Sequence, residues 1–254
     1  MKIIDSHTHL YQPDFDGDRD DVIQRANDLG VERFYLPGID KAVWPRMMDM
    51  QERYAGVFAM PGLHPVSVGE HYQDELDFVE AQLKSGGWPA IGEIGLDFYW
   101  DKTFTRQQFE VFHKQMEWAL DLNLPIVIHT RNAMQETIET VKPFAEKGLR
   151  GVFHCFTDNL QSAKQIVDME FLLGIGGVLT YKNARLPEVL VHLSLEHLIL
   201  ETDAPYLTPV PFRGKRNESS YLRYVIETLA ETYQVTPEEV AARTTENALN
   251  LYKT

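Results

Sequence analysis

The sequence predicts an α/β fold, because short, apolar, β-rich runs alternate along the chain with longer stretches of helical periodicity. This alternation is typical of parallel strands that are joined by crossover helices. Eight such runs occur in 254 residues, which is the size of a TIM (β/α)8 barrel. The sequence shows no linker, repeat or low-complexity stretch, so we expect one domain over residues 1–254.

The expected elements follow one another in a regular order. Strands are expected at residues 2–6, 32–37, 57–62, 89–94, 125–129, 151–155, 171–175 and 197–202. The helical stretches between them include residues 18–29, 105–122 and 159–169. In the second of these stretches, apolar residues recur at a spacing of three and four, which indicates one buried helix face: Phe109, Phe112, Met116, Ala119 and Leu120.

Two further helical segments follow the eighth strand, so the predicted fold is a barrel with extra C-terminal helices. The last segment begins with Thr236-Pro237-Glu238-Glu239, a capping box with proline at the first helical position. We expect its apolar residues to pack against the barrel wall, namely Val240, Leu249 and Leu251.

Composition and charge limit the possible classes of function. Cys155 is the only cysteine, which excludes an intrachain disulfide and favours a reducing, cytoplasmic setting. Polar residues interrupt the first apolar run, so we expect neither a secretory signal nor a membrane span. The formal net charge of −14 argues against binding nucleic acid by general electrostatic attraction. It leaves open a nucleic-acid substrate that enters a locally positive, metal-loaded cleft.

Histidines and carboxylates follow most of the expected strands. His7 and His9 are two residues apart, and such residues share one face of a strand, where two imidazoles suit a divalent metal ion. Barrel enzymes build their active sites at the C-terminal ends of the strands. The residues found there are His7, His9, His64, Glu93, Asp97, His129, His154, Glu201 and Asp203.

One histidine after a strand is more often a hydrogen-bonded structural residue than a ligand. Six runs that carry histidine or carboxylate at the same end are difficult to explain by core packing, and they favour a metal site. Glu93 stands within a buried strand, where a carboxylate needs a partner or a metal ion. The remaining histidines fall in helical or linking stretches, and we interpret them as ordinary surface or packing residues: His71, His113, His192 and His197.

The candidate ligands are too many for one tetrahedral ion and suit a pair of ions that share a carboxylate. We assign His7, His9 and Asp203 to one ion, and His129 and His154 to the other, with Glu93 bridging. Two ions about 3.5–4 Å apart can activate a water and stabilise the attacking and leaving oxygens. Asp203 is then the expected general base. Nitrogen and oxygen ligands are compatible with Mg, Mn, Zn, Ni or Co.

The motifs at the strand ends, taken together, resemble the TatD family of metal-dependent deoxyribonucleases. The resemblance covers nearly the whole chain and implies a TIM barrel of the amidohydrolase superfamily. It also implies a divalent-metal phosphodiesterase, typically a nuclease that acts from DNA 3′ ends. Some members lack the first H-x-H, and its presence here favours full two-metal occupancy. The matching strings are Asp5-Ser6-His7-Thr8-His9, Gly62-Leu63-His64-Pro65, Gly92-Glu93-Ile94-Gly95-Leu96-Asp97, His129-Thr130-Arg131, His154-Cys155-Phe156-Thr157, Glu201-Thr202-Asp203-Ala204-Pro205-Tyr206 and Arg213-Gly214-Lys215-Arg216-Asn217-Glu218.

Substrate choice must come from residues beside the ligands. Arg131, Arg213 and Arg216 are candidates for contacts with phosphate oxygens, with Lys215 beside them. The alternative for Lys215 and Arg216 is that they belong only to a solvated loop. An aromatic cluster follows Asp97 and either stacks the bases of a single strand or folds onto the barrel rim. Its members are Phe98, Tyr99 and Trp100, with Phe104 and Phe212 nearby in other loops.

The other polar residues at this face have supporting roles. We expect His64 to donate a hydrogen bond to the scissile phosphate or the leaving group, because it exceeds the ligand count. Glu201 and Asp97 are expected to support the ligands from behind. Cys155 is expected to point away from His154 toward the helices.

The sequence therefore predicts a two-metal phosphodiesterase that hydrolyses DNA at single-stranded ends, and the resemblance to the TatD family implies a 3′–5′ exonuclease. The alternative is a hydrolase of the same superfamily that cleaves an amide, ester or lactone, which would not need Arg131 or the later basic cluster. A metal-binding partner module without catalysis would need neither His64 nor Arg131. We predict DNA as the substrate and no obligate protein partner.

Overall fold

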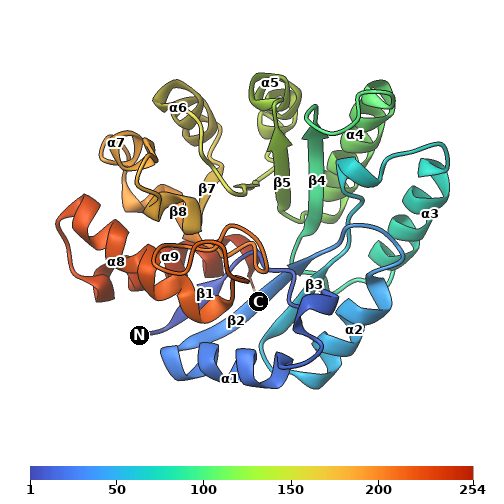
Figure 1. Cartoon of the computed structure of the whole chain (residues 1–254). Coiled ribbons are helices and arrows are strands. Elements are labelled where there is room, and N and C mark those ends of the chain that lie inside the picture. Colours follow the sequence, from blue (N-terminus) through green and yellow to red (C-terminus); the bar gives the residue numbers. More distant parts are fainter. Residues whose placement is uncertain (254) are drawn as a thin grey trace.

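Eight parallel strands form a closed ring in the computed structural model, which describes residues 1–253 (Figure 1). Hydrogen bonding groups β1 to β3 in one sheet and β4 to β8 in another. Backbone bonds close both gaps between the sheets, from Gly92 N to Pro61 O (2.9 Å) and from Ser6 N to Leu200 O (3.0 Å). The strands are β1 (Ile3–Asp5), β2 (Val31–Pro37), β3 (Val57–Met60), β4 (Ile91–Asp97), β5 (Ile126–Arg131), β6 (Gly151–Phe153), β7 (Leu172–Ile175) and β8 (Leu198–Leu200).

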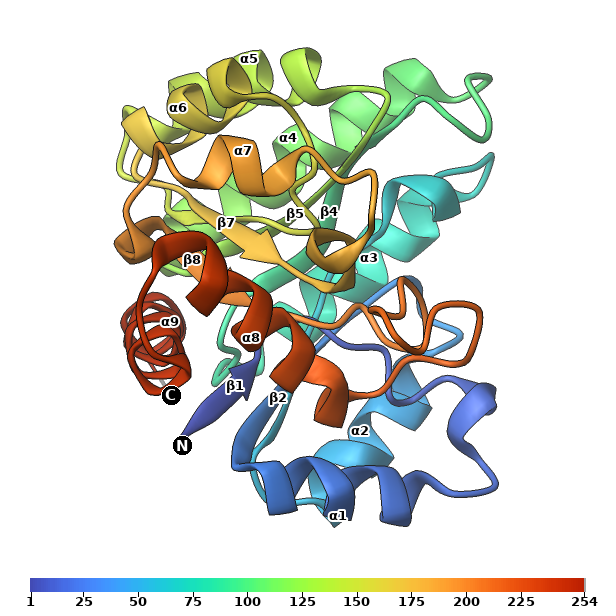
Figure 2. The same cartoon turned by 60° about the vertical axis from the view of Figure 1, so that its left-hand side comes forward.

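Helices surround the ring, which confirms the predicted TIM barrel with extra C-terminal helices (Figures 1 and 2). The helices expected at residues 18–29, 105–122 and 159–169 all form, and the first ends at Gly30, whose positive φ suits glycine. The helices are α1 (Arg19–Leu29), α2 (Trp44–Arg53), α3 (Tyr72–Leu83), α4 (Thr105–Leu122), α5 (Met134–Ala145), α6 (Leu160–Asp168), α7 (Leu186–Leu190), α8 (Leu222–Tyr233) and α9 (Pro237–Tyr252).

Apolar residues form two layers because side chains alternate between the two faces of each strand. The larger cluster lies between the strands and the surrounding helices and includes the expected α4 residues Phe112, Met116 and Ala119. The smaller cluster joins residues from several strands to the last helix: Ile4, Tyr35, Met60, Ala90, Val127, Val152 and Ile199 with Ala248, Leu251 and Tyr252. In the part of the chain that the structure describes, no helix has both the length and the apolarity required to cross a bilayer.

The last helix contacts the barrel differently from the prediction. Thr236 accepts a hydrogen bond from Glu239 N (3.2 Å), as the predicted cap requires, and Val240 and Leu251 are buried. Leu249 is exposed, so its predicted contact with the barrel wall is wrong. The reason is that α9 lies beside β1 and β8 and packs Leu251 and Tyr252 into the smaller cluster (Figure 2).

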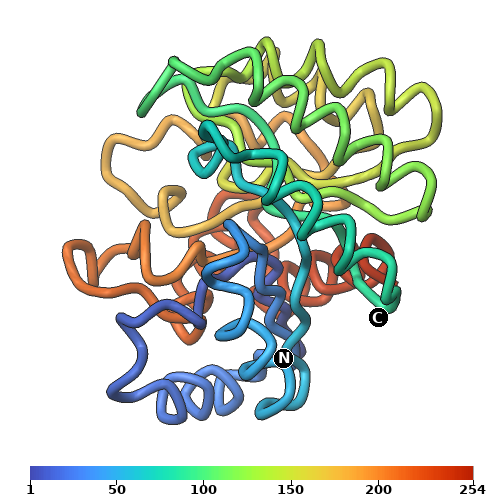
Figure 3. Tube along the Cα trace, turned by 90° about the vertical axis from the view of Figure 1, so that its right-hand side faces the viewer, coloured from blue at the N-terminus to red at the C-terminus, as the bar shows by residue number. Residues whose placement is uncertain are grey.

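The two ends of the barrel have different structures. In Figure 3 the loops after β1 and β8 gather on one side of the molecule, while α9 lies on the other side. The loop side is the C-terminal end of the parallel strands, where every predicted site residue lies. The helix side carries Tyr252, whose ring stacks on Tyr35 at 4.1 Å between centroids and whose hydroxyl donates to Ser6 O (3.2 Å).

We predict that Tyr252→Ala lowers the free energy of unfolding by about 3–5 kcal/mol, because it leaves a cavity where the ring packs on Tyr35. Tyr252→Phe keeps the ring and loses one hydrogen bond, so its loss should be only about 1 kcal/mol. Urea unfolding of the three proteins measures both values. Equal stability of the alanine and phenylalanine variants would show that the ring contributes nothing to the packing.

Candidate metal centre

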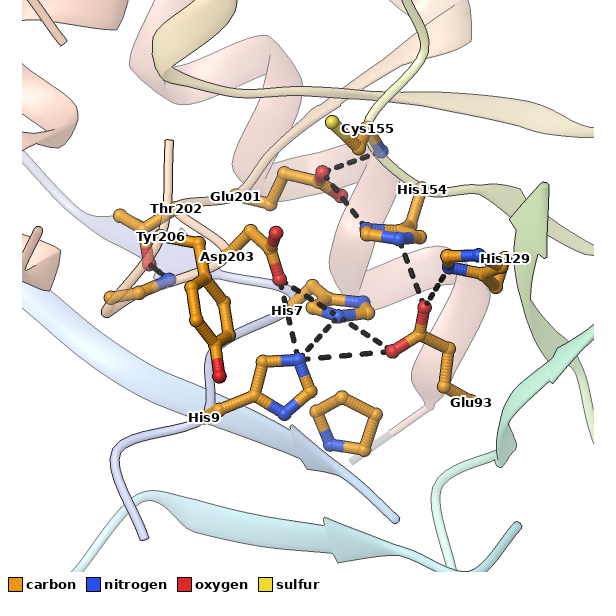
Figure 4. A network of polar contacts seen from close by, with 12 residues as sticks. His7, His9, Glu93, His129, His154, Cys155, Glu201, Thr202, Asp203 and Tyr206 are labelled. Carbon is orange, nitrogen blue, oxygen red and sulfur yellow. Dashed lines mark hydrogen bonds and ion pairs between the residues drawn. The ribbon is translucent and has the colours of Figure 1, made fainter. Parts of the chain in front are cut away.

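The two histidines of the H-x-H motif converge although they lie outside the first strand. β1 ends at Asp5, so strand alternation does not explain their common direction. The loop is held instead by backbone bonds from Thr8 N to Tyr35 O (3.1 Å) and from His9 N to Ala204 O (2.8 Å). The Nε2 atoms of His7 and His9 consequently lie 3.3 Å apart, facing two carboxylates (Figure 4).

His7, His9 and Asp203 form the first candidate ligand group, and Glu93 lies beside it. His7 Nε2 lies 3.2 Å from Glu93 Oε2 and 3.6 Å from Asp203 Oδ1, and His9 Nε2 lies 3.7 Å and 3.3 Å from the same oxygens. Ligands that bind one tetrahedral ion at about 2.1 Å are separated from each other by about 3.4 Å. The spacing and the nitrogen and oxygen donors of His7, His9 and Asp203 therefore fit a divalent ion, and Glu93 Oε2 lies beside this group.

The other oxygen of the same glutamate faces a second group. Glu93 Oε1 lies 2.9 Å from His129 Nδ1, 3.0 Å from His154 Nε2 and 3.5 Å from His64 Nε2. The rings of His7 and His154 stack in parallel, 3.9 Å between centroids, and thereby bring the two groups side by side. One carboxylate thus touches both groups, which is the geometry of a bridging ligand.

The charges at the centre explain why these buried carboxylates are ionised. Burial opposes ionisation of Glu93, but the neighbouring histidines, above all the charged His154, hold its pKa well below the usual range. Burial likewise opposes the charged form of His154, yet Glu93 and Glu201 raise its pKa well above the usual value. For Asp203, burial is again outweighed, mainly by the contact with His9 and by the charge of His154, and the pKa is lowered. Divalent cations would replace the positive charge that the histidines supply.

Tyr11 fixes the proton of His9, a role that we did not predict from the sequence. The Tyr11 hydroxyl donates its one proton to Pro37 O (2.7 Å), so it must accept from His9 Nδ1 at 2.6 Å. Burial raises the pKa of Tyr11 well above its usual value, so the hydroxyl keeps this proton. His9 therefore carries its proton on Nδ1 and presents the lone pair of Nε2 to the centre.

His64 is held in the opposite tautomer. Val66 N donates to His64 Nδ1 (3.0 Å), so the proton of the neutral ring must lie on Nε2, which faces the centre. Burial lowers the pKa of His64 and keeps the ring neutral. A ligating nitrogen needs a free lone pair, and this geometry therefore favours the predicted role of hydrogen-bond donor over that of ligand.

Two carboxylates support the histidines of the second group from behind. Asp97 Oδ2 accepts from His129 Nε2 at 2.9 Å, which directs Nδ1 toward Glu93. Glu201 Oε1 lies 3.4 Å from His154 Nδ1 and accepts from Cys155 N (2.6 Å). The Glu201 side chain fits only because residue 174 is glycine. A Cβ atom at position 174 would lie 2.1 Å from Oε2 of Glu201. Asp97 and Glu201 thus lie behind two candidate ligands, and their supporting role stays a prediction.

Other buried polar residues hold the loops that carry the site. Gln108 and Gln115 lie on the apolar face of α4. The side-chain amide of Gln108 forms hydrogen bonds with both the backbone N–H and the backbone carbonyl of Asp97, and that of Gln115 does the same with Leu63. Sequence reasoning missed them, although two glutamines seven residues apart on an apolar helix face were an available signal. Asp5 similarly accepts from Thr202 N (3.0 Å), beside Asp203, while burial raises the pKa of Asp5 to about 7.

The predicted phosphate-binding residues have different surroundings. Arg131 is exposed and lies over the ring of Tyr99 at 3.8 Å, and Arg213 lies over Tyr181 at 4.1 Å. Arg216 instead binds both carboxylate oxygens of Asp18, each at 2.7 Å, so its donors are already engaged. The structure therefore gives Arg216 a role in fixing its loop, and a phosphate contact there would have to break this ion pair.

The strand-end motifs and the fold together match a known family. The family model described as TatD related DNase matches residues 4–253. The chain belongs to the TatD family. A metal-dependent hydrolase of Bacillus subtilis, YabD, whose function is uncharacterized, is 40% identical over 252 residues, which are 99% of each chain. This finding confirms the predicted resemblance and shows that the protein is a metal-dependent hydrolase.

Two further TatD-family relatives resemble the chain over nearly its full length. The 3′–5′ ssDNA/RNA exonuclease TatD of Citrobacter koseri is 30% identical over 98% of each chain. The crystal structure of YjjV, a TatD homologue of Escherichia coli K12, superposes with a TM-score of 0.93. It is 29% identical and the match covers 99% of this chain and 98% of that one.

We predict that Glu93→Gln empties both metal positions, because the amide loses the charge that both ligand groups require. Metal content after dialysis, measured by mass spectrometry, should fall from two equivalents per chain to near zero. Glu80→Gln is the matched control, since Glu80 pairs with Lys84 on the surface of α3. Retention of two equivalents by the Glu93 variant would contradict the bridging assignment.

We also predict that Tyr11→Phe weakens metal binding at the first group about 10- to 100-fold, because His9 loses the acceptor that fixes its tautomer. Competition with a chromophoric chelator measures the affinity. Tyr72→Phe, which removes a hydroxyl bonded to Glu110 on the surface, should have no effect. Unchanged affinity in the Tyr11 variant would show that the hydroxyl does not act on the ligand.

Proposed function

We propose that this TatD-family protein is a two-metal phosphodiesterase that hydrolyses DNA from single-stranded 3′ ends. The observation that carries the proposal is the position of Glu93, which presents one oxygen to His7 and His9 and the other to His129 and His154. Two ions that share a carboxylate would lower the pKa of water and neutralise charge on the phosphoryl group. These are the requirements of phosphodiester hydrolysis.

Asp203 is the proposed general base. Its carboxylate is ionised because the contact with His9 and the charge of His154 lower its pKa, and one oxygen is within 3.6 Å of both histidines of the first group. An ionised carboxylate in this position can orient a water and take its proton as the water attacks phosphorus. Asp203 N is fixed by a bond to His7 O (2.9 Å), so the base is held against the first ligand.

His64 is the proposed donor to the departing or non-bridging oxygen. Its Nε2 carries the proton and faces Glu93, while Val66 N holds the other nitrogen. A neutral donor in a buried site stabilises the negative charge that develops in the transition state. Arg131 and Arg213 are the proposed contacts to phosphates farther along the strand, because both are exposed and neither has an acidic side chain among the contacts described for it.

The name of the Citrobacter koseri relative supports a nucleic-acid substrate with a 3′–5′ polarity. The same centre could hydrolyse an amide, ester or lactone, and the exposed arginines at its rim favour the phosphodiester over that alternative. Charge also favours a local mode of binding, because the net charge of −14 repels DNA elsewhere on the surface. Location in the cytoplasm stays a prediction from the single cysteine.

The test is cleavage of a 5′-labelled single-stranded DNA oligonucleotide by chelator-stripped protein to which Mg or Mn is restored. We expect a metal-dependent ladder that shortens from the 3′ end, and we expect Asp203→Asn to lower kcat at least 100-fold with a much smaller effect on KM. An RNA oligonucleotide of the same sequence measures sugar preference. Folded, metal-loaded protein that cleaves esters or lactones and leaves the oligonucleotide intact would replace the proposal by the alternative.

A further inference from the structure

We propose that the cleft beside Trp100 receives one nucleobase of a single-stranded substrate, stacked on the indole ring, while Arg131 binds the adjoining phosphate. This inference rests on the proposed function and specifies how its substrate is held. The cleft has a volume of 210 Å³ and is lined by the loop that carries His64 as well as by the loop after β4. Its apolar wall consists of Pro65, Val66, Val68, Trp100 and Phe104.

Two large aromatic rings are exposed beside this cleft. The side chains of Tyr99 and Trp100 are 51% and 65% exposed, and their rings meet edge to face with centroids 4.9 Å apart. Two adjacent exposed rings at the C-terminal end of the barrel form a contiguous apolar surface, and such surfaces often mark a place where a ligand binds. The π-face of a base stacks on such rings whatever its sequence identity.

Arg131 supplies a positive charge at the same place. Its guanidinium lies 3.8 Å from the centroid of Tyr99 and 5.3 Å from that of Trp100. The rings pre-orient the guanidinium, and its edge stays free to bind phosphate oxygens. A flat apolar surface next to a fixed cation matches a nucleotide, which has a base and a phosphate, better than it matches an apolar peptide.

Asp97 connects this surface to the metal centre. One oxygen, Oδ1, accepts from Tyr99 N (2.9 Å) and Trp100 N (3.2 Å), and the other, Oδ2, accepts from His129 Nε2 (2.9 Å). Asp97 also pairs in register with Arg131 across β4 and β5. A single carboxylate thus fixes the aromatic loop relative to a candidate metal ligand, so the stacking surface keeps a constant position relative to the centre.

A nucleotide held in this way must be unpaired. A base that stacks on Trp100 has left the stack of a duplex, because the indole covers a face that a neighbouring base pair would otherwise occupy. We therefore expect the cleft, and not the metal centre, to provide the preference for single-stranded ends.

The test compares Tyr99→Ala/Trp100→Ala with the matched variant Tyr99→Phe/Trp100→Phe, which keeps both rings. Each metal-loaded protein is assayed on a single-stranded oligonucleotide and on copies in which an abasic unit replaces one of the last three nucleotides in turn. Wild type and the phenylalanine variant should show a KM about tenfold higher at one abasic position, with kcat little changed. The alanine variant should show this higher KM on every substrate and should not distinguish the abasic copy.

Binding provides a second readout that does not require cleavage. Fluorescence anisotropy with phosphorothioate-linked oligothymidine, which resists hydrolysis, measures affinity with and without the abasic unit. If DNA is cleaved but the abasic copies bind and react like the intact strand, the cleft proposal is wrong and the proposed function stands. If base-dependent binding occurs and no oligonucleotide is cleaved, the function is wrong and the cleft proposal stands. Equal losses in the alanine and phenylalanine variants would also overturn the cleft proposal.

Discussion

The structure of the site depends on one buried carboxylate. Glu93 stands inside the barrel with its side chain almost fully covered, where an unpaired negative charge would be strongly disfavoured. Its two oxygens are therefore surrounded by imidazoles from four loops or strands, including His7, His129 and His154. The imidazoles that stabilise the buried charge of Glu93 also form a candidate cation-binding site, because protons and divalent ions compete for the imidazole nitrogens.

The barrel separates the residues that stabilise it from those that act. Tyr252 and its neighbours on α9 pack among apolar residues of the strands, whereas the candidate ligands lie at the opposite, C-terminal ends. Buried polar side chains on the helices bind the backbone of the loops that carry the candidate ligands and fix their positions. Gln108 and Gln115 on α4 bind the backbone of Asp97 and of Leu63, the residue before His64. The positions of Asp97 and His64 are therefore fixed by a rigid helix.

The sequence was sufficient for features that repeat or that depend on residue type alone. All eight strands form near the residues predicted, because apolar runs between helical stretches are a strong local signal. His7, His9, Glu93, His129, His154 and Asp203 come together because parallel strands end at one face.

The sequence could not predict features that depend on distant partners. The tautomer of His9, for example, is set by Tyr11, whose hydroxyl donates to Pro37 O. The ion pair of Arg216 with Asp18 spans 198 positions, so no local pattern revealed it. Cys155 has φ +49°, a turn that strand alternation does not predict.

The chemistry of the centre and the choice of substrate are separate properties of this fold. Paired cations among histidines and carboxylates can promote hydrolysis of several kinds of bond. What distinguishes a strand of DNA from a lactone must therefore lie at the rim, where Arg131 is oriented by Tyr99 and Trp100. A protein with a net charge of −14 attracts DNA only through such local groups. Asp97 bonds to both the rim loop and His129, so under the proposed function the carboxylate that orients a candidate ligand also fixes the loop that would hold the strand. One side chain thus links the proposed substrate surface to the candidate metal centre.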